Sequence, residues 1–468
     1  MRRPLIPLFA LALAACSQTP ELSVPRLSLP DAYGAAAGAP ADTLPAPAAW
    51  WTMFGNAELD RLQQAALAAN HDLKAAIARI EQAEAQLKIA GAPLLPTLTA
   101  GLDGSNRMTH GGTASGGSGT RSASPSSTTQ RSFSASVSAS YEVDFWGKTR
   151  ASIQSAEAAL AATRFDRDTV ALTLTANVAT TWMQALALAD RVQAARRNLD
   201  LARQTLTLAE RQAEFGKKSA LDAAQQRATV ASIEARLPAL ELQYQQSVNA
   251  LAILTGLAPS QLRLESATLT GLPAPVVRAG LPSDLLRRRP DIARAEADLA
   301  AANANIGIAR AQLFPTLSLT AQGGYSNPYL ISLLDAHNTF WTLGTSLAAT
   351  LFDNGKLRGN VDLTEARLRE SAETYQSAVL TALREVEDQL AAIRWLAAQE
   401  EAQVRAVAAA REAQRLSDVR YREGAEEYLT VLESQRALLD AEDSAVQVRL
   451  ARLNASIGLV KALGGGMD

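Results

Sequence analysis

The feature that most constrains this chain is an internal repeat that covers most of its length. The motif LLPTL at residues 94–98 recurs as LFPTL at residues 313–317, an offset of 219 residues. The motif GKTR at residues 147–150 recurs as GKLR at residues 355–358, an offset of 208 residues. Offsets that stay constant over long stretches indicate two tandem copies of one structural unit.

Two glycine pairs extend the repeat toward the C-terminus. Gly216 matches Gly424 and Gly256 matches Gly464, both with the offset of 208, although the residues before the last two glycines differ. The step from 219 to 208 means that the first copy carries 11 additional residues. The Gly/Ser-rich run at 111–129 lies in this interval, and we expect it to form an exposed loop, because exposed loops tolerate insertions.

Each copy predicts the same order: helix, strand pair, long helix, turn, helix. The first copy is expected at residues 50–275, with strands near 94–104 and 132–143 and a helical hairpin over 148–256. The second is expected at residues 276–464, with strands near 316–325 and 339–352, a helical hairpin over 356–463, and a tail at 465–468.

The strands alternate between apolar or small residues and polar residues. In residues 132–143, five serines and Glu142 occupy the even positions, and Phe, Ala, Val and Tyr the odd ones. Segments of about ten such residues have the length and pattern of a transmembrane β-barrel strand. A soluble sandwich strand is the alternative, but four strands in two distant pairs are too few for a sandwich. Four strands also cannot close a barrel, so several copies of the chain must each contribute four.

The helices are long and have a coiled-coil seam. No proline occurs from Lys148 to Phe215, and Ala, Leu, Glu, Gln and Arg dominate. Apolar residues recur in a 4-3-4-3 rhythm at Leu172, Ala176, Ala179, Met183 and Leu186, and again at Val379, Leu383, Val386, Leu390 and Ile393. This spacing predicts coiled-coil packing. Pro238 is expected to kink the first returning helix.

The N-terminus resembles a bacterial secretory signal. Arg2 and Arg3 precede a short apolar stretch that ends at Cys16, the only cysteine. Residues 1–15 are therefore expected to be a signal peptide, with Cys16 acylated so that lipid holds the protein at a membrane surface. A free cysteine behind an ordinary signal peptide is the alternative. Residues 16–49, rich in Pro and Ala, predict an extended arm.

Several motifs together resemble the outer-membrane efflux protein family (the TolC-like outer-membrane factors), and within it the lipoproteins of NodT type. The matching segments are WWxxFG at 50–55, YEVDFWGK at 141–148, RRPDI at 288–292, FPTLSL at 314–319 and LFDNG at 351–355. Asn56 stands where an acidic residue is more usual, and the Gly/Ser-rich loop is not general in the family.

The resemblance implies a mainly α protein with a transmembrane β-barrel. It implies a homotrimer with a 12-stranded barrel and a 12-helix periplasmic tunnel, in the outer membrane. The partners implied are a periplasmic adaptor (membrane fusion protein), an inner-membrane pump that supplies the energy, and outer-membrane lipid through acylated Cys16. The function implied is passive conduction of small molecules, such as drugs or toxic compounds, to the exterior.

Two regions are the candidate functional sites. The hairpin tips around the two glycines would dock the adaptor, and the residues are Phe215, Gly216, Lys217, Ser219, Leu221, Arg422, Gly424, Tyr428 and Leu429. A periplasmic gate would be formed by Leu416, Asp418 and Arg420. The alternative at the tips is plain helix termination and re-capping. At the gate the alternative is a solvated helix face, although an acidic residue repeated around a ring would attract cations.

Composition excludes other functions. Lys+Arg is 45 and Asp+Glu is 47, and this near-neutral balance argues against nucleic-acid binding. A single cysteine and three dispersed histidines leave no metal-ligand spacing, and no phosphate loop or nucleophile motif occurs. We therefore expect no enzyme activity, cofactor or metal. The rival to a duct is a non-conducting trimeric coiled-coil scaffold or adhesin.

Overall fold

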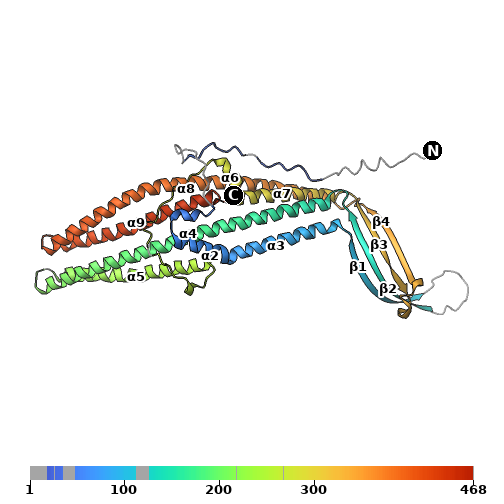
Figure 1. Cartoon of the computed structure of the whole chain (residues 1–468), viewed down its shortest axis with the longest axis horizontal. Helices are drawn as coiled ribbons and strands as arrows, with labels where there is room; N and C mark the ends of the chain where they lie inside the picture. The colour runs from blue at the N-terminus through green and yellow to red at the C-terminus, as the bar shows by residue number, and fades with distance from the viewer. Residues whose placement is uncertain are drawn as a thin grey trace. The chain divides into compact units, whose positions relative to one another are not determined.

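The computed structural model describes residues 18–25, 27–34, 48–111, 126–217, 219–266 and 268–466, and these fold mainly into helices (Figure 1). The first copy contains α2 (Ala57–Ala69), α3 (His71–Gly91), β1 (Thr97–Gly111), β2 (Ser126–Val143), α4 (Lys148–Glu214) and α5 (Ala220–Leu254). The second contains α6 (Leu285–Arg288), α7 (Pro290–Ala311), β3 (Thr316–Asn327), β4 (Thr339–Ala348), α8 (Lys356–Arg422) and α9 (Tyr428–Ala462). Short 3-10 helices join them at Trp50–Phe54, Ala92–Leu94, Pro259–Gln261, Pro282–Asp284, Leu330–Ser332 and Ala336–Asn338.

The helical hairpins repeat with the offset seen in the sequence. Helices α4 and α8 are each 67 residues long, and α5 and α9 are each 35. The first and last residues of each pair differ by 208 in number. Helix α5 continues through Pro238. No helix in the described ranges is both long and apolar enough to cross a membrane.

The strands differ from expectation at their ends. Strand β1 begins at Thr97 rather than near residue 94, because residues 92–94 form a 3-10 turn and Pro96 has no N–H for a ladder. Strand β2 begins six residues before the expected residue 132. Strand β4 ends at Ala348 rather than 352.

The chain divides into two compact units. The described residues among 1–24, 81–161 and 297–372 form the first unit, which holds the four strands. The second unit takes the described residues among 25–80, 162–296 and 373–468, including both hairpin turns.

The four strands form a single antiparallel sheet in the order β1-β2-β3-β4, so the two strand pairs are not separate. Strands β2 and β3, which belong to different copies, pair from Phe133↔Asn327 to Val143↔Leu317. Strands β1 and β4 are the edges of this sheet.

The two faces of the sheet differ in chemistry. Residues paired directly across an antiparallel ladder point to the same face. One face therefore gathers apolar side chains that are exposed to solvent in the single chain: Leu98, Leu102, Val137, Leu319, Trp341, Leu343 and Leu347. The other face gathers mainly Ser and Thr.

Each strand pair returns to a helix through a turn held by an aspartate. The Asp144 carboxylate accepts hydrogen bonds from the backbone N–H groups of Thr149 and Arg150, both at 3.0 Å. Asp353 accepts from Gly355 N at 3.0 Å and Leu357 N at 2.8 Å. These bonds satisfy N–H groups at the helix starts, the capping role that we expected for both aspartates.

The largest apolar cluster of the second unit lies around the WWxxFG segment. Trp50, Phe54 and Trp182 are buried there, together with the α4 seam residues Ala176, Ala179, Met183 and Leu186. Asn56 caps α2, because its side-chain oxygen accepts from Glu58 N and Leu59 N. The asparagine therefore performs the capping that an acidic residue would perform.

The RRPDI motif is a clamp between helices. The Arg289 guanidinium forms a two-pronged ion pair with Asp291, at 2.9 and 2.7 Å. It also donates to Glu385 Oε2 of α8 at 2.7 Å and to the carbonyl oxygen of Ala462, the last residue of α9, at 3.0 Å. Burial lowers the Arg289 pKa, but the bonds to Asp291 and Glu385 outweigh it and raise that pKa.

The described residues of the N-terminal arm have no helix or strand and contact each unit. In the first unit, Asn303 of α7 donates to the Pro20 carbonyl at 2.8 Å. In the second, Gly34 N donates to Glu387 Oε1 of α8 at 2.6 Å, and Tyr33 is buried beside it. The arm is therefore fixed to the fold by these contacts.

Candidate functional site at the helical hairpin tips

Both hairpins turn through the same backbone motif. In the first, Gly216 N donates to Ala213 O at 3.0 Å and Lys217 N donates to Gln212 O at 2.8 Å. In the second, Gly424 makes the equivalent bond at 3.0 Å, and the residue after it the other at 2.8 Å. This pair of bonds is the Schellman C-cap, which requires a residue with positive φ. Gly216 has φ of 66° and Gly424 of 77°, so glycine is the favoured residue at both tips.

The first tip is open to solvent. Phe215 has 74% of its surface exposed and Leu221 has 61%. Gly216, Lys217 and Ser219 are also exposed. Ser219 caps α5 by accepting a hydrogen bond from Leu221 N at 3.1 Å. Large apolar residues exposed at a rigid turn are a feature of protein-docking surfaces.

The second tip differs from expectation at one residue. Arg422, Gly424 and Leu429 are exposed, with Leu429 at 55%. Tyr428, which we expected on the docking surface, is only 3% exposed. Its ring packs edge-on against Tyr421 at a centroid distance of 5.9 Å. Tyr428 therefore packs inside the tip, where it helps to hold the helices together.

A buried glutamine links the two hairpins near their tips. Gln226 of α5 is fully buried and donates its amide N–H to Ala202 O of α4 at 2.7 Å. Its amide oxygen accepts a hydrogen bond from the Tyr428 hydroxyl of α9. Gln435 of α9 adds a second link by donating to Thr205 Oγ1 of α4 at 3.2 Å. Three helices thus share one buried polar network.

Burial also changes the ionisation of this network. It is the main cause that raises the pKa of Tyr428 to about 12. The pKa of Tyr421 is raised for the same reason. Both hydroxyls are therefore neutral at physiological pH, and the Tyr428 hydroxyl remains a hydrogen-bond donor.

The expected gate residues lie together in the last turns of α8 but have different surroundings. Leu416 is 46% exposed. The Asp418 carboxylate is mostly buried and pairs through Oδ2 with Arg422 at 2.7 Å, while its Oδ1 has no hydrogen-bond partner within the described ranges. Arg420 pairs with Glu426 at 3.4 Å and is largely exposed. In the single chain Asp418 is therefore an internal ion-pair partner.

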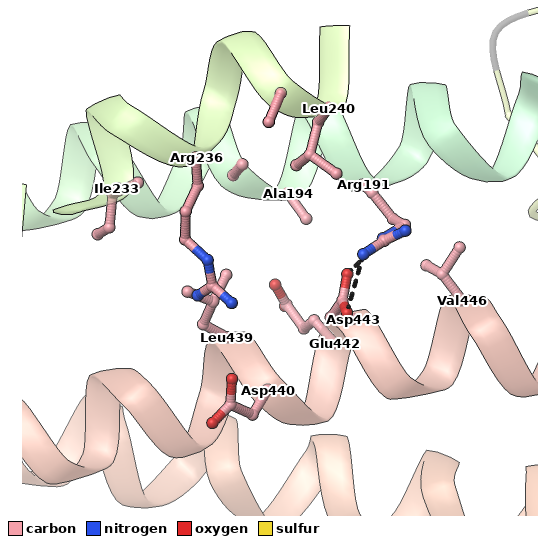
Figure 2. Close-up of a pocket in the computed structure, with 12 residues that line it drawn as sticks. Arg191, Ala194, Ile233, Arg236, Leu240, Leu439, Asp440, Glu442, Asp443 and Val446 are labelled. Atoms are coloured by element: carbon pink, nitrogen blue, oxygen red, sulfur yellow. Dashed lines mark hydrogen bonds and ion pairs between the residues drawn. The ribbon is translucent and has the colours of Figure 1, made fainter. Parts of the chain in front are cut away.

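A cavity of about 170 Å³ separates the hairpins farther along the same helices. Figure 2 shows Arg191 of α4 paired with Asp443 of α9 at its edge, with a shorter distance of 2.5 Å. Ile233 and Leu240 of α5 and Leu439 and Val446 of α9 supply apolar walls. The two hairpins are therefore incompletely packed against each other here.

Sequence reasoning located the turns but missed the links behind them. Gln226, Thr205 and Gln435 looked like ordinary polar positions on helices, and only the contact with another helix gives them a role. Cys16, the expected lipid attachment site, lies outside the described residues. Within the described ranges no group of three or more His, Cys, Asp and Glu could hold a metal ion.

Solved structures share this arrangement of a strand pair and a long helical hairpin in tandem. The outer-membrane channel MtrE of Neisseria gonorrhoeae, in its open state, superposes with a TM-score of 0.81 at 29% identity. The match covers 96% of this chain and 98% of that one. The fold is thus that of outer-membrane channels.

The sequence comparison agrees with the fold. The profile of the family described as outer membrane efflux protein matches residues 62–257 and 281–465, and the chain belongs to that family. The pyoverdine export outer membrane protein OpmQ of Pseudomonas aeruginosa is 45% identical over 97% of this chain and 95% of its own length. The protein of the same name from Pseudomonas putida is 42% identical over 99% and 97%.

Family membership confirms the resemblance that the motifs predicted. The protein is an outer-membrane efflux protein, with a mainly helical fold in two tandem repeats.

Proposed function

We propose that the protein is a passive duct that conducts small molecules across the outer membrane. The observation that carries the proposal is the two-faced sheet. Its apolar face, with Leu98, Leu102 and Trp341, is exposed in the single chain, and β1 and β4 are its edges. In lipid each backbone polar group needs a partner, so such a sheet is stable there only when further copies close it into a barrel.

Three copies are the number that the family resemblance implies. Three sheets of four strands would give a 12-stranded barrel, within the known range for membrane barrels. The apolar face would meet lipid and the Ser/Thr face would line the lumen. The hairpins of three chains would form the 12-helix periplasmic tunnel, with acylated Cys16 as an additional anchor.

The exposed hairpin tips would dock a periplasmic adaptor, and an inner-membrane pump would supply the energy. The contacts that we propose involve Phe215, Leu221 and Leu429, because each is a large apolar side chain exposed at a rigid turn. Tyr428 is left out because it is buried. Leu416, Asp418 and Arg420 would narrow the tunnel end once three copies bring them together.

The cargo would be a small molecule chosen mainly by the pump and adaptor. The relatives that cover almost the whole chain are named for pyoverdine export, which makes an exported molecule of that class a candidate. Drugs and other toxic compounds are the alternative cargo. Export assays on cells that lack the protein, with pyoverdine and with antibiotics as the two probes, would separate these cargoes.

One experiment tests the assembly and the docking surface. The full chain is extracted from membranes in mild detergent, its native mass is measured, and co-purifying envelope proteins are identified. We expect a trimer that carries an adaptor protein. The variants Phe215→Asp and Leu429→Asp should lose the adaptor while remaining trimeric.

The matched control is Val276→Asp, because Val276 is 88% exposed but lies between the two repeats and away from the tips. This control should retain the adaptor. A trimer without any envelope partner and without conductance in a planar bilayer would support the scaffold or adhesin instead. A monomer would refute the barrel-closure argument.

A further inference from the structure

The Ser/Thr face of the sheet carries an inference about what passes along it. We propose that this face is a charge-balanced, hydrogen-bonding lining, and that the molecules passing it are hydrophilic and rich in hydroxyl or amide groups. Their passage through the sheet region would not depend on the sign of their charge. The inference rests on the proposed function, because the face must line a lumen.

The register of the strands defines the face without ambiguity. Thr99 pairs with Ser138, Ser138 with Gln322, and Gln322 with Thr342, so one row of hydrogen-bonding side chains crosses all four strands. The adjacent row on the opposite face has a different character: Ala100, Val137, Gly323 and Trp341. A shift of one residue in any strand would exchange the two characters, so the pairing itself separates them.

Neighbouring rows on the same face continue the pattern. The next row on one side is Thr97, Ser140, Thr320 and Gly344, and beyond the central row lie Gly101, Ser136, Gly324 and Phe340. The row after that contains Asp103, Ser134 and Ser326. Phe340 contributes apolar surface but no charge.

The side chains on this face bond to one another across the strands. Thr99 Oγ1 and Ser138 Oγ are 2.7 Å apart, and Gln322 Nε2 donates to Ser136 Oγ at 3.2 Å. A hydroxyl has one donor and two acceptor positions, so each of these bonds leaves further capacity. The lining can therefore exchange hydrogen bonds with a polar molecule that has lost part of its water shell.

The charges on the described part of this face nearly cancel. Asp103 and Arg107 lie four residues apart on β1, on the same face, and carry opposite charges. Glu142, near the end of β2, is paired with Lys148 at 3.1 Å. Rings of one charge sign give membrane pores their ion preference. A face whose charges balance in each copy forms no such ring, whatever the number of copies.

Paired cysteine variants of the full chain test the proposal. Ser134→Cys and Ser136→Cys place a thiol on the Ser/Thr face, and Ala135→Cys and Val137→Cys place it on the apolar face. Each variant, in outer-membrane vesicles, is treated with two water-soluble methanethiosulfonates, one carrying trimethylammonium and one sulfonate. The unmodified chain, whose only cysteine is Cys16, measures the background.

We expect labelling of the two Ser→Cys variants and little labelling of their neighbours. After division by the rates for a free thiol in solution, the cationic and anionic rates should agree within about threefold, because a potential of about one kT would already separate them about sevenfold. In the Ser136→Cys background, Asp103→Asn should favour the anionic reagent and Arg107→Gln the cationic one.

The possible failures are distinguishable. If the alternation of labelling is absent or reversed at both pairs, the face does not line a lumen, and the proposed function fails with the inference. If the alternation is present but the normalised rates differ more than about sevenfold at both serine positions, the duct stands and the charge-balanced lining is refuted. Two positions are used so that poor folding of one variant does not decide the result.

Discussion

The hydrogen bond from Tyr428 to Gln226 gives the sharpest test of the structure, because it joins two hairpins through buried groups. Removing the hydroxyl with Tyr428→Phe preserves the ring but leaves the Gln226 amide oxygen buried without its donor. Such an unsatisfied polar group costs about 1–3 kcal/mol. The hairpin tips should therefore open roughly 5- to 150-fold more often.

The assay is hydrogen exchange of the full protein in detergent, read by mass spectrometry on peptides from α5 and α9. Local opening exposes amides even when the rest of the molecule stays folded. We expect faster exchange near Gln226 and Tyr428 and unchanged exchange elsewhere. Tyr244→Phe is the matched control, because Tyr244 lies on α5 but 18 residues away from Gln226.

The double variant Gln226→Leu with Tyr428→Phe separates a coupled link from two independent losses. Replacing both partners by apolar groups removes the unsatisfied atom, so the double variant should be less destabilised than the sum of the single ones. If Tyr428→Phe changes local exchange less than twofold, or if the two effects simply add, the link between the hairpins is not an energetic one.

Three further outcomes follow from particular contacts. Gly256→Ala should destabilise far more than Gly216→Ala by thermal unfolding: both have positive φ, which costs an L-residue about 1–2 kcal/mol, but a Cβ at Gly256 would lie 2.8 Å from the next helix and one at Gly216 would meet nothing. Because the folded-state pKa of Tyr428 is raised from 10.0 to about 12, its contribution is intact below pH 10 and about 2–3 kcal/mol is lost as the pH rises to 12, an effect that Tyr428→Phe should abolish in alkaline unfolding measurements. Arg289→Met should cost about 3–5 kcal/mol in denaturant titrations, because it strands two carboxylates, whereas Arg288→Met should cost much less.

The sequence by itself determined the local order of the fold. The offset of 208 residues reproduces the bounds of both hairpins, because caps and helix lengths depend on nearby residues such as Gly216 and Gly424. The seam at Ala176, Ala179 and Met183 is buried as its spacing predicted. The alternation in β2 likewise gave the sheet its two faces, because the side-chain period of a strand is fixed.

The tertiary structure decided what depends on contacts between distant segments. The sequence showed two strand pairs, and the pairing of β2 with β3 made one sheet of them. Tyr428 stood at an expected surface, and packing against Tyr421 together with its bond to Gln226 buried it. Periodicity states which face of an element is apolar, but it does not state which neighbour covers that face. Burial, hydrogen-bond partners and pKa shifts all depend on that neighbour, so they became known only from the folded chain.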